Sequence, residues 1–514
     1  MPRKPPEFLE EGCPACTYHF LYKGTADGSY VKCGSCRSVF TRDEQGRLLP
    51  YRLAVNPATG KTLVQITSCD RADVDRAVGA ARRSFEDGRW SRQSPEQRKE
   101  TLLRFAQLLE ENAEEIARLD TLDAGKPITD CRTIDLPETV KCFRWYAEAA
   151  DKLFHSVAPT GPRHLGLIVR EPVGVVAAVL PWNFPALMFA WKVAPALAVG
   201  NSVVVKPSKL TSLSAIRMTE LAAQAGVPDG VLNIVPGSGE KVGRALGRHR
   251  DVDAVSVTGS TEVGRLFLGY SSESNLKKVV LELGGKNPQI VLADAPDFEI
   301  VAQDVLSAGY WNMGENCSAG SRLLVHYSIK DELLESVVKH ATEWTVGDPL
   351  DPVTKVGPMV EERHMEKVLG YIETGRDEGA KVVIGGERVL EETGGYFVAP
   401  TIFDNVSRDM RVAREEIFGP VICVIPFKDE EEAIEIANDT NYGLTASLWT
   451  RNVDSALRVS RAVRAGTVSV NCFSEGDITT PFGGYKESGF GGRDNGLEAF
   501  DQYTEVKTIW MTIR

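Results

Sequence analysis

The sequence predicts an α/β protein with two doubly wound domains and a small cysteine-rich unit at its N-terminus. Short runs rich in β-branched residues alternate with stretches of helical apolar spacing, the pattern of parallel sheets covered by helices on both faces. The alternation restarts after Gly285, which indicates a second domain of the same kind. Predicted strands span 175–180, 202–206, 231–235, 254–257 and 278–281 in the first domain, and 289–292, 322–326, 380–384, 421–426, 447–450 and 467–470 in the second.

Helices are predicted before the first of these strands and before a polar cysteine-containing segment. Residues 72–87 and 95–119 carry apolar side chains three and four positions apart, the spacing of an amphipathic helix. Residues 298–311 are predicted to form another helix, which ends just before the cysteine segment.

Length and charge limit the classes of function. A chain of 514 residues is too long for a single hydrophobic core, so several domains are expected. The formal net charge of −12 makes nucleic acid an unlikely partner and disfavours an anionic membrane. The first residues lack an apolar export signal and no later segment is apolar enough to span a membrane, so we expect a cytoplasmic protein.

Four of the ten cysteines lie close together near the N-terminus, in a CxxC-x16-CxxC pattern. Two such turns can offer four thiolates to a tetrahedral zinc ion, so residues 1–50 are predicted to form a zinc-ribbon-like unit. Redox thiols and rubredoxin-like iron are the alternatives. The site would be structural, because all four ligands come from the protein. The predicted ligands are Cys13, Cys16, Cys33 and Cys36.

Three residues elsewhere suggest chemistry. Cys317 lies in the polar, glycine-flanked segment NMGENCSAG, where an exposed thiol could act as a nucleophile, although an inert packed thiol is the alternative. Glu282 ends an apolar strand before two glycines, at the strand end where α/β sheets place ligands; a solvated glutamate is the alternative. Asn183 occupies a similar turn, where it could simply cap a helix.

Two glycine-rich turns follow predicted strands and open helices. One contains Gly237, Gly239 and Gly243, and the other contains Gly259, Ser260 and Gly264. Helix N-termini bind phosphate through unpaired N–H groups, and glycine allows close approach. The pair of turns predicts a dinucleotide cofactor.

At this point the sequence resembles the NAD(P)-dependent aldehyde dehydrogenase superfamily. The resemblance runs from about residue 54 to the C-terminus, through PWNFP, KPS, TGSTEVG, ELGGK, GENC, EEIFGP and PFGGYKESG. RWYAEAADK, SEGDITTPFGGYKESG and QYTEVKTIW most resemble its bacterial aminoaldehyde branch, which includes γ-glutamyl-γ-aminobutyraldehyde and 4-guanidinobutyraldehyde dehydrogenases. The resemblance implies a dinucleotide-binding domain (51–153 and 173–283), a catalytic domain (284–485) and oligomerisation segments (154–172 and 486–514).

The resemblance also implies roles for four residues. Cys317 would attack the aldehyde to form a thiohemiacetal, and Asn183 with the Cys317 N–H would hold its oxyanion. Glu282 would activate the water that hydrolyses the resulting thioester. Lys206 would contact the cofactor ribose and the Asn183 region. Branches that transfer the acyl group to coenzyme A lack this glutamate, so hydrolysis to the free acid is expected.

The implied cofactor is NAD or NADP. NAD-preferring members usually carry a glutamate after KPS, where this chain has Lys209, whose ammonium could pair with a 2′-phosphate. We therefore expect NADP to be accepted; a solvated loop lysine is the alternative. The implied cofactor-binding residues are Pro181, Trp182, Lys206, Ser208, Lys209, Gly239, Gly243, Gly259, Ser260, Gly264, Leu283, Glu416 and Phe418.

The substrate is expected to be a small aldehyde, with an ω-aminoaldehyde favoured by acidic residues at the tunnel mouth. The alternative for each of these acidic residues is an ordinary exposed side chain without a role in substrate binding. Asp494 stands where many members have glutamate, which puts any proton-relay role in doubt. The implied substrate residues are Phe184, Met188, Trp191, Asp135, Ser318, Phe473 and Asp477, with Glu475 in the same loop.

The family resemblance further implies a homodimer or homotetramer. The competing interpretation is a catalytically silent scaffold of the same fold that carries a zinc-ribbon interaction module. A catalytically silent scaffold would not need all four implied catalytic residues, and this chain retains Cys317, Glu282, Asn183 and Lys206.

Overall fold

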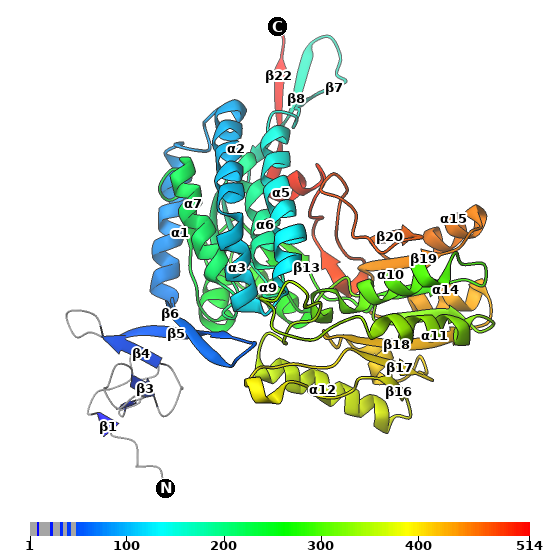
Figure 1. Cartoon of the computed structure of the whole chain (residues 1–514). Coiled ribbons are helices and arrows are strands. Elements are labelled where there is room, and N and C mark those ends of the chain that lie inside the picture. The colour runs from blue at the N-terminus through cyan, green and yellow to red at the C-terminus, as the bar shows by residue number, and fades with distance from the viewer. Residues whose placement is uncertain (1–7, 10–20, 24–30, 34–38, 43–47) are drawn as a thin grey trace.

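The computed structural model describes the backbone of residues 8–9, 21–23, 31–33, 39–42 and 48–514, and the side chains from residue 52 onward. Two α/β domains lie next to each other, and a narrow arm projects from one of them (Figure 1). The predicted α/β class is confirmed, with sheets that are mainly parallel. Within the described range, no helix combines the length and apolarity needed to cross a bilayer.

The first domain is built on a sheet with the strand order β11-β10-β9-β12-β13-β21. Its strands are parallel except β21, which runs antiparallel to β13. All five predicted strands are present. The bounds are β9 Val175–Val179, β10 Ser202–Lys206, β11 Leu232–Ile234, β12 Ala254–Thr258, β13 Lys278–Glu282 and β21 Gly489–Phe490.

Helices cover both faces of this sheet, as the alternation predicts. Apolar side chains of α1, α8 and α9 pack on one face, and those of α2, α5, α6 and α7 pack on the other. The bounds are α1 Arg71–Glu86, α2 Pro95–Glu111, α3 Ala113–Ala124, α4 Ile128–Asp130, η1 Cys131–Asp135, α5 Leu136–Ala149, α6 Pro185–Ala198, α7 Leu213–Ala225, η2 Gly239–Gly243, α8 Arg244–Arg248, α9 Thr261–Ser272 and α16 Ala499–Tyr503.

The single helix predicted over 95–119 is wrong, because the chain bends at Asn112. There the backbone leaves the helical region (φ −108°, ψ 16°), which ends α2 and begins α3. The Asn112 side-chain amide donates to the carbonyl of Leu108 at 2.8 Å, and local bonds of this kind compete with the helix. The apolar spacing continues through the bend, so periodicity alone could not reveal it.

The second domain has the strand order β16-β17-β18-β15-β14-β19-β20, parallel except for β16 against β17. The predicted strands are present, and β17 is an additional strand that sequence reasoning missed because it is short and directly follows Pro400. The strands are β14 Pro288–Val291, β15 Arg322–His326, β16 Lys381–Ile384, β17 Thr401–Asp404, β18 Val421–Phe427, β19 Thr445–Trp449 and β20 Thr467–Val470.

Two apolar layers enclose the second sheet. Side chains of α10 and α11 pack on one face, and those of α12, α13, α14 and α15 pack on the other. The helices are α10 Phe298–Tyr310, η3 Trp311–Gly314, α11 Lys330–Ala341, α12 Glu362–Asp377, η4 Glu391–Thr393, α13 Arg411–Arg414, α14 Glu430–Asn438, α15 Val453–Ala462 and η5 Lys486–Ser488.

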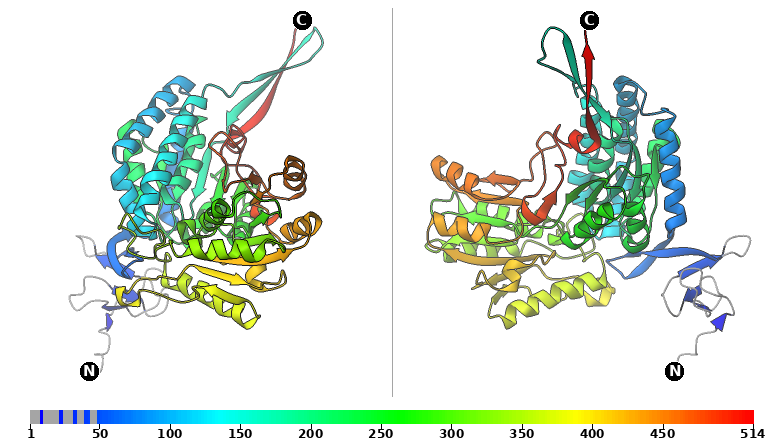
Figure 2. Two further views of the ribbon diagram at one scale, coloured as in Figure 1. Left: turned by 45° about the vertical axis from the view of Figure 1, so that its right-hand side comes forward. Right: turned by 180° about the vertical axis from the view of Figure 1, so that it is seen from behind.

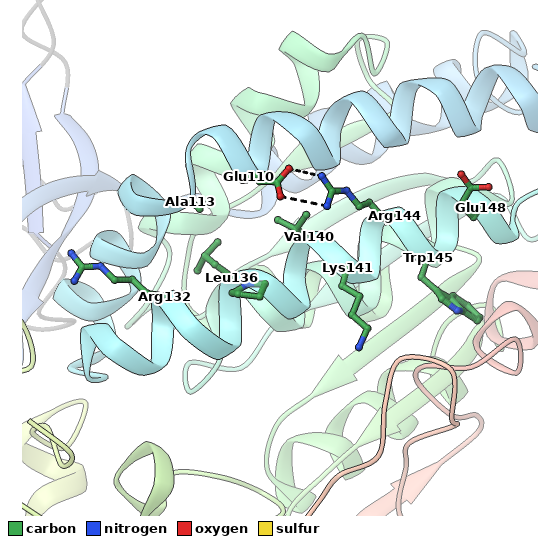
Figure 3. Close-up of a pocket in the computed structure, with 10 residues that line it drawn as sticks. Glu110, Ala113, Arg132, Leu136, Val140, Lys141, Arg144, Trp145 and Glu148 are labelled. Atoms are coloured by element: carbon green, nitrogen blue, oxygen red, sulfur yellow. Dashed lines mark hydrogen bonds and ion pairs between the residues drawn. The ribbon is translucent and has the colours of Figure 1, made fainter. Parts of the chain in front are cut away.

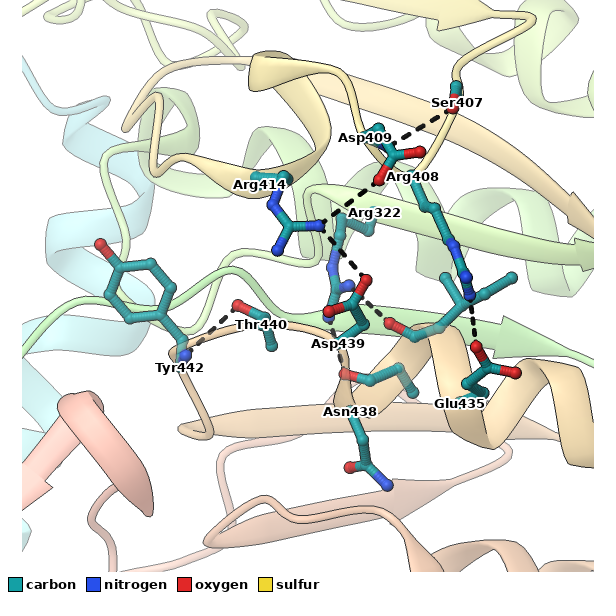
Figure 4. A network of polar contacts seen from close by, with 12 residues as sticks. Arg322, Ser407, Arg408, Asp409, Arg414, Glu435, Asn438, Asp439, Thr440 and Tyr442 are labelled. Atoms are coloured by element: carbon teal, nitrogen blue, oxygen red, sulfur yellow. Dashed lines mark hydrogen bonds and ion pairs between the residues drawn. The ribbon is translucent and has the colours of Figure 1, made fainter.

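A polar network fastens α13 and α14 to the start of β15 (Figure 4). Arg322 is buried and donates to the carbonyls of Ile436 at 2.9 Å and Ala437 at 3.0 Å. Arg414, at the end of α13, pairs with Asp439 at 3.2 Å. These bonds satisfy the last carbonyls of α14 and fix the segment that leads directly into Glu415 and Glu416.

The arm is a three-stranded sheet formed by β7 (Ser156–Ala158), β8 (His164–Pro172) and β22 (Thr504–Thr512). It extends away from the first domain (Figure 2). Several large apolar side chains on it are exposed, including Val157 at 66% and Trp510 at 58%. Phe490, also in the predicted 486–514 segment, instead pairs with Leu281 in the first domain's sheet.

The N-terminal strands form an antiparallel meander in the order β1 to β6. Cys13, Cys16 and Cys36 lie outside the described residues, and only the backbone of Cys33 is described. In the part of the chain that the structure does describe, no cluster of metal-ligating side chains is present. The strands are β1 Phe8–Leu9, β2 Leu21–Lys23, β3 Val31–Cys33, β4 Val39–Arg42, β5 Leu48–Asn56 and β6 Lys61–Thr67.

Candidate active site

A cavity of about 600 Å³ runs between the two domains, at the carboxyl ends of β9, β10, β12 and β13. This is the position where doubly wound sheets bind ligands. The structure brings to its wall every predicted cofactor residue except Gly264: Pro181, Trp182, Lys206, Ser208, Lys209, Gly239, Gly243, Gly259, Ser260, Leu283, Glu416 and Phe418.

The glycine-rich turns shape one part of this cavity. Ser260 caps α9 by accepting a hydrogen bond from the N–H of Val263 at 3.3 Å, so the helix N-terminus opens on the cavity. A Cβ at Gly239 would meet nothing within 4 Å, which leaves room for a ligand against the backbone. Gly264 has a packing role instead, because a Cβ there would lie 2.8 Å from the Leu283 side chain. These features fit the pyrophosphate of a dinucleotide.

Positive charge gathers at the KPSK turn. Lys206 is buried at the end of β10 and donates to the carbonyl of Pro207 at 2.8 Å. Burial, with smaller contributions from the nearby charges of Arg52 and Lys209, lowers the pKa of Lys206 to about 8. Lys209 is exposed and lines the cavity, as does the acidic Glu240.

Glu416 and Phe418 line the same cavity as Cys317. The Glu416 carboxylate accepts a hydrogen bond from the N–H of Gly285 at 2.9 Å. A Cβ at Gly284 would lie 2.3 Å from the Glu416 Oε2, so any larger residue there would displace this carboxylate. Phe418 has φ +62°, a strained value for a bulky residue of the kind that clusters at ligand sites. Its ring packs edge-on against Trp182 at 5.1 Å.

The loop that carries Cys317 begins with three successive left-handed residues, Asn312, Met313 and Gly314. Such runs are rare and need outside support. The support comes from Asn312, whose side-chain amide donates to the carbonyls of Asn183 and Glu315, each at 3.0 Å. The Asn183 amide also donates to the Glu315 carbonyl at 2.9 Å. These bonds hold the Asn183 turn and the cysteine loop in fixed relation.

A second asparagine holds the other side of the loop. The side-chain amide of Asn287 donates to the carbonyls of Cys317 at 2.8 Å and Ala319 at 3.0 Å. The thiol itself is in a buried environment, which raises the pKa of Cys317 well above its ordinary value. The carboxylates of Glu475, Glu416 and Glu282 raise it further, in that order. This environment favours the protonated thiol of Cys317 over the thiolate.

Glu282 is the last residue of β13 and is 3% exposed. Burial raises the pKa of Glu282 well above its ordinary value, and Asp494 raises it further, while Lys192 and Arg493 oppose this. Lys192 and Asp494 are fully buried and form an ion pair at 2.6 Å. The residue whose role was in doubt, Asp494, is thus part of the electrostatic environment of Glu282.

A second cavity, of about 350 Å³, is lined by Glu475, whose carboxylate contacts Asn316 and Ser318 of the cysteine loop. Of the predicted substrate residues, Trp191, Phe473 and Asp477 line it. Phe184, Met188 and Ser318 are buried behind its wall. Glu475 and Gly476 of the predicted loop 473–477 also line it. Lining residues that the sequence did not single out are Ile134, Glu138, Leu187, Ser307, Trp311, Ile478 and Asn495.

The expectation that Asp135 stands at the tunnel mouth is wrong. Its side chain is buried, and its carboxylate lies 2.6 Å from the Lys126 Nζ, which stacks over the ring of Phe184 at 4.0 Å. The helix from Leu136 turns this residue inward, whereas its neighbours Ile134 and Glu138 face the cavity.

A third hollow, of about 520 Å³, lies on the outer helix layer between α2 and α5 (Figure 3). Glu110 and Arg144 form an ion pair at its wall, and Arg132 pairs with Glu114. Lys141 pairs with Asp477 and Glu148 with Lys99, so each charged group of this hollow has a partner, and the hollow is separate from the cysteine loop.

Comparison with known proteins agrees with this geometry. The model of the aldehyde dehydrogenase family matches residues 50–509. This chain belongs to the aldehyde dehydrogenase family. It is 56% identical over 458 residues to aminoacetaldehyde dehydrogenase of Pseudomonas aeruginosa, covering 89% of this chain and 92% of the relative. It is 47% identical over 459 residues to the NADP/NAD-dependent aldehyde dehydrogenase PuuC of Escherichia coli, with coverage of 89% and 92%.

A solved structure is similar over nearly the whole chain. The indole-3-acetaldehyde dehydrogenase AldA of Pseudomonas syringae, solved as a mutant in complex with NAD+ and IAA, has a TM-score of 0.90 and 52% identity. The alignment covers 92% of this chain and 95% of that one. The predicted activity is confirmed: the protein is an NAD(P)-dependent aldehyde dehydrogenase. The alternative of a silent scaffold is not favoured.

Sequence reasoning missed the residues that hold this aldehyde dehydrogenase's catalytic groups in place. Asn312, Asn287 and Lys192 are polar side chains in otherwise apolar or glycine-rich segments, and the structure buries all three. Buried polar side chains need partners, so a polar residue inside an apolar segment was the available signal. The identity of those partners depends on contacts between distant parts of the chain.

Proposed function

We propose that this aldehyde dehydrogenase oxidises ω-aminoaldehydes, whose ammonium tail is drawn to the acidic substrate cavity. The observation that carries the proposal is the charge of the cavity wall, which includes Glu138, Glu475 and Asp477. Lys141 pairs with Asp477 at 2.5 Å and contacts Glu138 at 3.4 Å, so it offsets only part of this charge. A relative at 56% identity is named aminoacetaldehyde dehydrogenase, which agrees with a cationic substrate.

A neutral aromatic aldehyde is the second candidate. Trp191, Trp311 and Phe473 give the cavity aromatic walls, and the AldA structure contains IAA. Steady-state kcat/KM values for 3-aminopropanal, its neutral isostere butanal, and indole-3-acetaldehyde decide between the candidates. The proposal requires a preference for 3-aminopropanal over butanal. Equal values, or a preference for indole-3-acetaldehyde over both, would refute it.

The residues at the cysteine loop support a two-stage reaction. Cys317 would add through its sulfur to the aldehyde carbon, and its proton would leave to water. The remaining side-chain N–H of Asn183 and the Cys317 backbone N–H would stabilise the oxyanion of the thiohemiacetal. NAD(P)+, when bound, supplies the acceptor for the hydride that leaves this carbon. Glu282, in its ionised form, would then take a proton from the water that hydrolyses the Cys317 thioester.

The positive charge at the KPSK turn supports acceptance of NADP as well as NAD. Lys209 lines the cavity on the exposed side of this turn, and an ammonium there pairs favourably with a 2′-phosphate. A relative at 47% identity is named NADP/NAD-dependent, which agrees with dual use. The test is the ratio of kcat/KM for NADP and NAD in wild type and Lys209→Glu. The substitution should lower the ratio about tenfold, and an unchanged ratio would remove this role.

We also propose that the arm, residues 154–172 with the C-terminal strand β22, pairs subunits of a homodimer or homotetramer. Ile509, Trp510 and Met511 are consecutive exposed apolar residues of β22. Exposed apolar patches of this kind mark protein interfaces. Sedimentation of wild type and Trp510→Lys tests this role. The substitution should shift the protein toward smaller species; an unchanged species distribution would argue against it.

Zinc binding by Cys13, Cys16, Cys33 and Cys36 is proposed on the spacing of the two CxxC pairs alone. The expected site is structural. Elemental analysis of purified wild type should find about one zinc per chain, and Cys13→Ser/Cys16→Ser should lose it. Metal-free native protein would refute the proposal.

A further inference from the structure

Glu475 is in close contact with both neighbours of the catalytic cysteine. Its carboxylate accepts hydrogen bonds from the side-chain amide of Asn316 at 3.2 Å and from the hydroxyl of Ser318. It also lines the substrate cavity, on the loop between β20 and η5. Among the three carboxylates that raise the pKa of Cys317, Glu475 has the largest effect. The carboxylate therefore contacts the residues on both sides of Cys317 and acts on the thiol through its charge.

The cations nearest Glu475 are paired with other acids. Lys126 is held by Asp135 at 2.6 Å behind the Phe184 and Trp311 rings. Lys141 is held by Asp477 at the cavity mouth. Both hydrogen-bond donors to Glu475 are neutral, and burial raises the pKa of Glu475 above its ordinary value. A cation in the cavity would therefore favour the ionised carboxylate. Of the other two acids at the wall, Asp477 pairs with Lys141 at 2.5 Å, and Glu138 contacts the same ammonium at 3.4 Å.

We propose that Glu475 binds the ammonium group of a short ω-aminoaldehyde, and so determines both the charge and the chain length of the preferred substrate. This inference rests on the proposed aminoaldehyde activity. The carbonyl carbon has to reach the Cys317 sulfur while the ammonium reaches Glu475. Because Glu475 contacts the residues on both sides of Cys317, a linker of few methylene groups suffices. A longer chain carries its charge past Glu475 to the mouth, where Lys141 already pairs with Asp477 and contacts Glu138.

The same contact couples substrate charge to the nucleophile. Without a cation, Glu475 disfavours the thiolate of Cys317. An ammonium bound to Glu475 offsets that negative charge and lowers the pKa of the thiol. Cationic aldehydes therefore meet a more reactive cysteine than neutral aldehydes do.

The first test compares wild type, Glu475→Gln and the matched control Asp477→Asn. The glutamine keeps an oxygen that accepts from Ser318 and Asn316, and it removes only the charge. Aminoacetaldehyde, 3-aminopropanal and 4-aminobutanal are each compared with a neutral isostere: propanal, butanal and pentanal. We expect Glu475→Gln to lower the kcat/KM ratio of aminoaldehyde to isostere about 10- to 100-fold, most for the shortest pair. Asp477→Asn, already paired with Lys141, should lower it less than about threefold.

The outcomes separate this inference from the proposed function. If wild type shows no preference for the cationic member of any pair, the aminoaldehyde proposal fails. If wild type shows the preference and Glu475→Gln retains it, the aminoaldehyde proposal stands and the role of Glu475 is refuted. An equal loss for cationic and neutral aldehydes would assign Glu475 a purely structural role and would also refute it.

The second test needs neither turnover nor cofactor. Alkylation of Cys317 by iodoacetamide at pH 7 is followed by mass spectrometry of its peptide, with ethylammonium chloride or the same concentration of sodium chloride. Ethylammonium should accelerate alkylation of wild type and leave Glu475→Gln unaffected, and the variant should react faster than wild type in sodium chloride. An absent, opposite or equal effect of ethylammonium in the two proteins would overturn the coupling, and wild type alone provides this readout if the variant does not fold.

Discussion

The cleft proposed to bind the cofactor and the cavity proposed to bind the aldehyde are built differently. The cleft depends on backbone: the N-terminus of α9, the open space at Gly239, and Gly284, which leaves room for Glu416. The aldehyde cavity depends on side chains from separate segments, such as Glu138, Trp311 and Glu475. Backbone sites are tied to local motifs and can be found from sequence. Side-chain cavities depend on packing between distant segments.

Loss of the nucleophile should have the largest effect on turnover. It should abolish the chemical step while leaving ligand binding in both cavities intact. Cys317→Ser is expected to lower kcat about 10³-fold or more, because an alcohol is a far weaker nucleophile than a thiolate. Fluorescence titration should show that cofactor binding changes little. Substantial remaining activity would mean that another group attacks the aldehyde.

Removal of the base should interrupt the reaction after hydride transfer. Glu282→Gln is expected to lower steady-state kcat about 10²- to 10⁴-fold, while a first-turnover burst of reduced cofactor remains. Stopped-flow absorbance at 340 nm measures both. A variant that loses the burst and the steady-state rate equally would place Glu282 before the thioester instead.

The acidity of Glu282 also predicts a pH dependence. Burial and Asp494 raise the pKa of Glu282 well above its ordinary value of 4.5, and the base must be ionised to accept a proton. Thioester hydrolysis should therefore slow as pH falls through this raised pKa and level off above it. Single-turnover hydrolysis rates across the pH range report this directly. A hydrolysis rate that falls only near the ordinary glutamate pKa would contradict the raised pKa of Glu282.

Loss of the oxyanion donor should have a smaller effect on chemistry. Asn183→Ala removes the side-chain N–H groups, and its expected cost is about 10²- to 10³-fold in kcat. Asn183→Asp is the matched variant, since it keeps the size of the side chain and replaces the donor with an acceptor. Both should lower the burst rate, and a burst rate equal to that of wild type in either would remove Asn183 from the oxyanion site.

A change on the cofactor side should have the smallest effect and should spare the thiol. Gly284→Ala places a Cβ where the Glu416 carboxylate now lies, 2.3 Å from Oε2. We expect cofactor Kd to rise about tenfold as Glu416 is displaced. Alkylation of Cys317 should stay within about twofold of wild type. Equal disturbance of cofactor binding and thiol reactivity would show that the two sides are not independent.

The sequence was informative where one segment determines the structure. The five strands of the first sheet and the turns at Gly239 and Gly259 follow from local patterns. The bend at Asn112 interrupts a continuous apolar pattern and was missed. Asp135 was misplaced because the turn entering α5 buries it against Lys126, a contact made by packing.

The same limit applies inside the active site. Cys317, Glu282 and Asn183 stand in recognisable motifs, but their supports do not. Asn312 acts only because the Asn183 turn lies against the cysteine loop. Lys192 and Asp494 are far apart in sequence and meet only in the folded core. Their roles could be assigned only from the folded structure.

The central claim is that Cys317 carries the acyl group until water activated by Glu282 removes it. Glu282→Gln incubated with NAD+ and 3-aminopropanal, then digested with protease at low pH for peptide mass spectrometry, tests this claim most directly. The account predicts the mass of the aminoacyl thioester on the peptide that contains Cys317, and its absence in Cys317→Ser/Glu282→Gln. An unmodified Cys317 peptide, or an adduct on the exposed Cys472 instead, would contradict it.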